Sequence, residues 1–77
     1  MTDEQWGALQ GNLLKAVGKN NYASWIEPLA YDGLSEGVAT FNVPTTFLGN
    51  YVKQNFGDQI LYQMMGMGLD VSRVRFM

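Results

Sequence analysis

The residues of this chain that could do chemistry are carboxylates, lysines and arginines, because the sequence contains neither His nor Cys. Without those two residue types the chain lacks the commonest general base, a thiolate nucleophile and the usual zinc ligands. No spacing forces two carboxylates to converge in a cleft, as acid–base catalysis requires. The sequence therefore predicts no catalytic residue, no metal site and no cofactor, and a protein that is not an enzyme. The carboxylates lie at expected caps, turns and helix ends: Asp3, Glu4, Glu27, Asp32, Glu36, Asp58 and Asp70.

Two glycine-containing segments could approach a phosphate group. Residues 66–68 (GMG) have no third glycine and no Walker lysine, so we expect them to end a helix. Residues 18–21 (GKNN) lie between two predicted helices, where KH modules place a loop that contacts the nucleic-acid backbone. The second glycine of that loop is absent. The segment is therefore either a connection between helices or a weak single-stranded nucleic-acid contact through Lys19 and Asn20.

The basic residues are few: Lys15, Lys19, Lys53, Arg73 and Arg75, in a chain of net charge −2. Binding driven by phosphates typically uses about 6–10 contacts, which this chain cannot supply alone. Arg73 and Arg75 alternate on a predicted strand and share one face, which is typical of a solvated or edge-protecting pair.

Length and composition predict one folded domain spanning residues 1–77. Hydrophobic residues make up 47% and charged residues 16% of the sequence, which excludes the composition of a disordered chain. The N-terminal segment is acidic and polar, unlike a signal peptide, and no apolar run approaches the ~20 residues that span a bilayer. We therefore expect a cytoplasmic protein.

Three helices are predicted. Thr2 and Gln5 have the spacing of a capping box, and Gly18 suits the end of the helix that follows. A short second helix is expected to be capped by Asn20 or Asn21 and to stop near residue 26, because Pro28 should keep residue 27 out of helical angles. A long third helix should begin at residue 45 or 46 and end at the glycines of residues 66–68.

Three strands complete the pattern. Residues 30–34 and 38–43 form a hairpin around a turn at residues 35–37, and residues 69–77 alternate as a last strand. The order α-α-β-β-α-β predicts an α+β fold with helices packed on a small three-stranded sheet. The expected packing residues are Trp25, Ile26, Phe41, Val52, Phe56 and Leu61. Periodicity alone favours the core for Trp6 as well, although its place near the chain end also fits a contact surface.

Trp6, the segment SWIEPL at residues 24–29, and VPTTF at residues 43–47 leading into NYV at residues 50–52 occur in a specific order. In that order and at those separations, the chain resembles the N-terminal domain family of the bacterial chromosomal replication initiator DnaA over essentially its whole length. The resemblance implies a KH-like fold. It also implies an interaction module that self-associates weakly, recruits the replicative helicase and binds regulators of initiation.

The resemblance also implies site residues. Trp6 matches the centre of self-association, with Gln5, Leu9 and Gln10 bordering the contact. Gln5 is polar where family members can be apolar, which implies a smaller patch and a weaker dimer.

Phe47 matches a helicase-contacting aromatic residue of the family. The family's acidic position in the second helix falls on Asn21, which is uncharged. The alternative function is a weak, KH-like single-stranded nucleic-acid binder.

Overall fold

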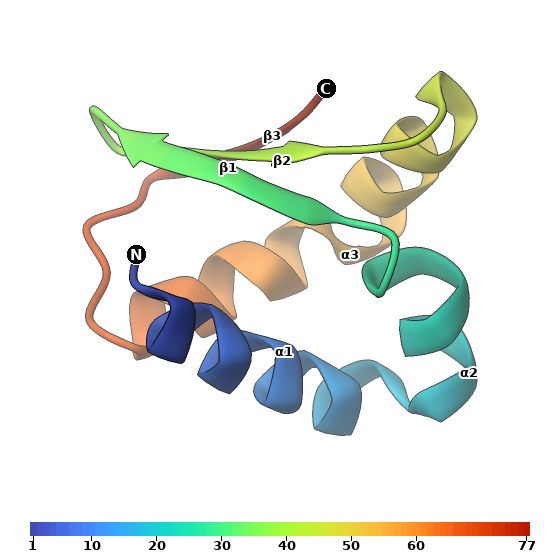
Figure 1. Cartoon of the computed structure of the whole chain (residues 1–77), viewed down its shortest axis with the longest axis horizontal. Helices are drawn as coiled ribbons and strands as arrows, with labels where there is room; N and C mark the ends of the chain where they lie inside the picture. Colours follow the sequence, from blue (N-terminus) through green and yellow to red (C-terminus); the bar gives the residue numbers. More distant parts are fainter.

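The computed structural model describes residues 1–77 and has the element order α-α-β-β-α-β, which confirms the predicted α+β fold. The helices lie together on one face of a three-stranded sheet, whose other face is uncovered (Figure 1). No helix is both long and apolar enough to cross a membrane. The elements are α1 (Asp3–Val17), α2 (Lys19–Asn21), a π-helical turn η1 (Tyr22–Ile26), β1 (Ala30–Ser35), β2 (Val38–Asn42), α3 (Thr46–Gly66) and β3 (Arg73–Phe76).

The first and last helices begin where the sequence predicts, because side chains cap them. Thr2 Oγ1 accepts from the Gln5 backbone N–H at 3.1 Å, and Gln5 Oε1 accepts from the Thr2 N–H at 2.9 Å, so the capping box is complete. Thr45 caps α3 by accepting from the Leu48 N–H at 3.1 Å. Gly18, at φ 88°, ends α1.

The second helix differs from the prediction in two ways. It begins at Lys19, directly after Gly18, so neither Asn20 nor Asn21 is its cap. Glu27 adopts helical angles (φ −55°, ψ −39°) although Pro28 follows it, and its N–H donates to the Tyr22 carbonyl at 2.8 Å. This bond spans five residues and widens the last turn into η1, which offsets the modest steric cost of a helical residue before proline. The expected end near Ile26 is confirmed.

The central strand of the sheet is β2, with antiparallel β1 on one side and parallel β3 on the other. Glu36 and Gly37 connect β1 to β2 with φ values of 53° and 79°, as a two-residue type I′ turn requires. A β-bulge at Asp32 shifts the register of β1. The last strand is shorter than predicted, because residues 69–72 precede β3 as an irregular connection.

The core lies between the helices and the inner face of the sheet. Every fully buried residue outside the glycines is apolar, and no polar side chain is buried. The predicted packing residues Ile26, Phe41, Val52 and Phe56 are buried, whereas Trp25 and Leu61 are half-buried at its margin. The buried apolar residues are Leu9, Leu13, Ile26, Leu29, Ala39, Phe41, Val52, Phe56, Ile60, Met64 and Val71.

Candidate functional site

An aromatic cluster forms where η1 meets the first turns of α3. Trp25 comes from η1, and Phe47 and Tyr51 come from successive turns of α3. The rings of Trp25 and Tyr51 stack with centroids 3.7 Å apart and an angle of 16° between their planes. Phe47 lies against both, with centroids 6.3 Å from Trp25 and 6.4 Å from Tyr51. We call Trp25, Phe47 and Tyr51 the aromatic cluster.

One side of the aromatic cluster packs on the core, and the other side is exposed to water. Tyr51 lies 6.2 Å from the buried ring of Phe56, which joins the cluster to the core. Phe47, in contrast, is 71% exposed, the most exposed large apolar side chain of the chain. A large ring held on two stacked rings and open to water is the kind of residue that anchors a protein contact.

Asn21 borders this part of the surface. It is exposed, and it precedes Trp25 by four residues in the continuous segment of α2 and η1, a spacing that makes two residues neighbours on a helix surface. Its amide Nδ2 donates to the Val17 carbonyl at 3.1 Å, which satisfies the end of α1. The side chain brings no charge to the cluster.

Trp6 occupies a different environment from Phe47. It is half-buried, and its ring lies 6.0 Å from Tyr31 and 5.6 Å from the buried ring of Phe41. The N-terminal amine of Met1 donates a hydrogen bond to the hydroxyl of the same Tyr31 at 3.3 Å. Trp6 therefore packs on the core with part of its ring and leaves the rest at the surface.

The predicted neighbours of Trp6 do not form a continuous exposed patch. Leu9 is 0% exposed, because its side chain fills the core between α1 and the sheet. The expectation that Leu9 borders a surface contact is therefore wrong. Gln5 is half-buried and engaged in the capping box. Gln10 is half-buried as well. Only part of Trp6 and the polar side chains of Gln5 and Gln10 are thus available at this end of α1.

The other predicted candidates are dispersed. Lys19 and Asn20 are exposed at the start of α2, where the Gly18 carbonyl accepts from the Tyr22 N–H at 2.9 Å and so serves the helix. No group of three or more carboxylates lies close enough to hold a metal ion.

The pKa values of two tyrosines are shifted from their ordinary value. Burial raises the pKa of Tyr22, and the nearby Glu27 carboxylate raises it further. Burial alone raises the pKa of Tyr31. In both cases the neutral phenol is favoured over the phenolate.

The sequence predicts a core position for Trp25 and does not single out Tyr51, so the packing of both rings beside Phe47 was not expected from it. Phe47 and Tyr51 are four residues apart on one helix, a spacing that places two side chains on the same face. That spacing was the available signal. No sequence signal predicted the contact with Trp25, because it joins η1 to α3, two segments that are distant in the sequence.

The chain is similar to known proteins over nearly its whole length. The family profile of the DnaA N-terminal domain matches residues 3–65. The chromosomal replication initiator protein DnaA of Roseobacter denitrificans is 58% identical over 76 residues, and that of Ruegeria pomeroyi is 55% identical over 76 residues. Each alignment covers 99% of this chain but only 17% or 16% of the relative. The DnaA of Rhodopseudomonas palustris is 26% identical over 61 residues, 79% of this chain and 13% of the relative.

Proposed function

Because the chain belongs to the DnaA N-terminal domain family, we propose that it is a protein-interaction module of a chromosomal replication initiator. In this proposal it associates weakly with itself and recruits the replicative helicase and regulators of initiation. It carries no catalytic step of its own. The chain spans only 16–17% of the length of these relatives, so in this proposal ATP-driven and origin-reading activities would reside elsewhere in such an initiator.

The proposal that this chain binds the helicase rests on the exposure of Phe47 beside the stacked rings of Trp25 and Tyr51. Covering a side chain of this size transfers well over 100 Å² of apolar surface out of water, worth about 2–3 kcal/mol. The two rings beneath it are already fixed by packing, so binding costs little further side-chain entropy. Since Asn21 is uncharged, the contact is expected to be mainly apolar and to depend only weakly on salt.

Self-association is proposed to use the exposed part of Trp6 together with Gln5 and Gln10. Only part of the ring is open, and its neighbours are polar, so the area covered in a dimer would be small. Small interfaces with a single anchor are weak, since association must first offset several kcal/mol of lost freedom. Such a contact gains strength when several copies are tethered side by side.

The test is a titration of the fluorescently labelled chain with the replicative helicase encoded by the same genome, followed by anisotropy. Phe47→Ala is expected to weaken binding by at least tenfold, since a central aromatic anchor typically contributes 2 kcal/mol or more. The matched control is Tyr62→Ala, because Tyr62 is 66% exposed on the same helix. Fifteen residues separate it from Phe47, or ~22 Å along the axis.

Both variants should keep the thermal unfolding midpoint within a few degrees of wild type, because exposed side chains contribute little to stability. Equal binding by Phe47→Ala and wild type would reject the assignment of the aromatic cluster. Equal weakening by both variants would show that the contact is not centred on the cluster.

A further inference from the structure

The outer edge of β3 has unused backbone hydrogen-bonding groups. In the sheet order β1-β2-β3, β3 is an edge strand. The Arg73 N–H donates to the Gly37 carbonyl at 3.1 Å, and the Met77 N–H donates to the Phe41 carbonyl at 2.9 Å, so these residues face β2. Alternate residues of a parallel strand direct their backbone groups to opposite sides. The N–H and C=O groups of Val74 and Phe76 therefore point away from the sheet.

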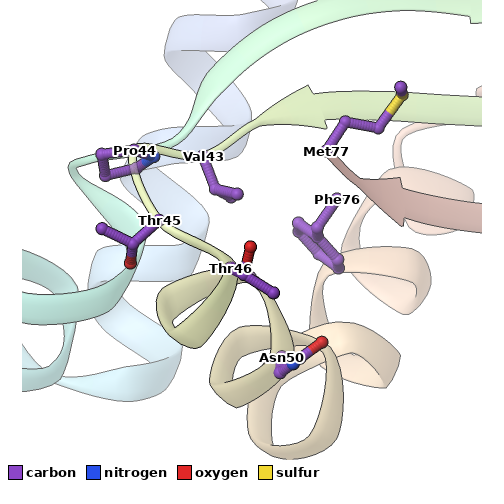
Figure 2. A pocket seen from close by; sticks show the side chains of 8 residues that line it. Val43, Pro44, Thr45, Thr46, Asn50, Phe76 and Met77 are labelled. Atoms are coloured by element: carbon purple, nitrogen blue, oxygen red, sulfur yellow. The ribbon is translucent and has the colours of Figure 1, made fainter.

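A groove runs along this edge, between β3 and α3. It consists of three neighbouring hollows of about 280, 370 and 200 Å³ that share lining residues. All four residues of β3 line the middle hollow. Consecutive side chains of a strand point to opposite faces of the sheet, so a hollow that touches all four residues must lie along the edge of β3. Figure 2 shows one end of the groove, where Phe76 lies across from Thr46 and Asn50 of α3.

Glycine and cations shape the α3 wall of this groove. A Cβ at Gly49 would lie 3.0 Å from Val43 Cγ2 and 3.7 Å from Phe76 Cβ, so α3 approaches the end of β3 closely at this point. One turn further on, Lys53 lines both the middle and the last hollow. We call the whole depression the β3 groove.

The β3 groove is the most basic part of a chain whose net charge is −2. Lys53, Arg73 and Arg75 line the middle hollow, three of the five cations in the sequence, and no carboxylate lines it. Asp58 lines the last hollow beside Lys53 and Arg73, and Arg75 also lines a fourth hollow, outside this groove, together with Asp32 and Glu36. An occupant must therefore bring negative charge as well as backbone groups that pair with Val74 and Phe76.

The opposite edge of the sheet is unlike this one. There, the β-bulge at Asp32 interrupts the regular spacing of β1 that an added strand would need. A second copy of β3 is also a poor occupant of the β3 groove, because it would bring Arg73 and Arg75 against like charges. These two features favour an acidic strand from a different protein.

We propose that the outer edge of β3 accepts an extended acidic segment of a partner protein as a fourth strand of the sheet. Backbone bonds to Val74 and Phe76 would provide the pairing, and Lys53, Arg73 and Arg75 would select glutamate- or aspartate-rich segments. This surface is separate from the aromatic cluster and from Trp6, so the proposal stands independently of the proposed function.

The test uses a short fluorescein-labelled peptide of alternating glutamate and threonine, titrated with the chain and followed by anisotropy. Binding is expected to weaken at least tenfold in the double variant Arg73→Glu/Arg75→Glu and to weaken as salt rises. In the complex, amide hydrogen exchange of Val74 and Phe76 should slow, because their N–H groups become bonded. A lysine–threonine peptide that binds equally well, or unchanged exchange at Val74 and Phe76, would overturn the proposal.

A matched pair of variants separates backbone pairing from charge. Val74→Pro removes an outward N–H that β2 does not use, whereas Val74→Ala keeps that N–H and also shortens the side chain. Peptide binding should be lost in the proline variant and largely kept in the alanine variant, and equal binding by the two would contradict strand addition. If circular dichroism shows that the proline variant is unfolded, the exchange measurement on wild type decides. Tighter binding of oligothymidylate than of the acidic peptide, without slower exchange at Val74, would instead identify a nucleic-acid groove.

Discussion

Trp6 and Phe47 are both aromatic residues near the start of a helix, but they differ in what removing them would disturb. Phe47 rests on the surface of the aromatic cluster, whereas Trp6 contacts Tyr31 and the buried Phe41. A loss of function in a Trp6 variant therefore has two sources, the lost surface and the weakened core.

We predict that Trp6→Ala lowers the free energy of unfolding by about 2 kcal/mol, less than the 3–5 kcal/mol typical of a fully buried tryptophan. Urea denaturation followed by circular dichroism measures this. Leu14→Ala is the control on the same helix, because Leu14 is 41% exposed, and a smaller loss is expected. Sedimentation equilibrium at a temperature where both variants are folded then tests self-association. A Trp6→Ala variant as stable as wild type would mean that the ring contributes nothing to the core.

The burial of Leu9 shows how far the sequence predicts the position of a single residue. Its place in an apolar stripe of α1 indicates the core, and the structure buries it completely. Its assignment to the contact surface followed only from its closeness to Trp6 in the resemblance. On a helix, residues three apart share a broad face, but one can point inward while the other lies at the margin.

At the scale of elements, the β1–β2 hairpin carries a local conflict. Glu36 is the one residue other than glycine with a positive φ, at 53°, a conformation in which side chains are strained. Gly37 is well matched to its own φ of 79°, and a Cβ there would also lie 2.9 Å from Ser72 Oγ.

We predict that Glu36→Asn stabilises the protein by about 0.5–1 kcal/mol, because Asn-Gly is the preferred sequence of a type I′ turn. Thermal unfolding should show a midpoint a few degrees higher. Gly37→Ala is the opposing variant and should lower the midpoint. If both substitutions changed stability in the same direction, the type I′ conformation of the turn would be wrong.

Local signals predicted the elements well where a side chain or glycine alone decides the outcome, as at Thr2, Thr45 and Gly37. They failed at Glu27, where a five-residue backbone bond to Tyr22 outweighs the influence of the following proline. The aromatic cluster and the β3 groove were beyond such signals, because their parts come from segments that only the fold brings together.

At the scale of the whole molecule, burial of tyrosines links stability to alkaline pH. The pKa values of Tyr22 and Tyr31 are raised in the folded state, so the folded chain holds these protons more tightly than the unfolded chain does. Their contribution is fully present below the ordinary tyrosine pKa of about 10, and it is lost as the pH rises through the higher folded-state values.

We therefore predict that the urea midpoint falls as the pH rises above about 10, and that it falls less steeply in Tyr31→Phe. The measurement is a series of urea titrations from neutral pH to above 11. Identical slopes for Tyr31→Phe and wild type would show that ionisation of this phenol is not coupled to unfolding.

The parallel pairing of β2 with β3 has a consequence for the order of assembly. Its partners are about 35 residues apart, as between Gly37 and Ser72, whereas the β1–β2 hairpin closes through two residues. Hairpins form in about 1–10 μs, but distant pairings wait until the entropy of closing a long loop is offset by other contacts. We expect β3 to be the last strand placed and the first released, so an added strand on its outer edge would act on the unfolding rate of the whole sheet.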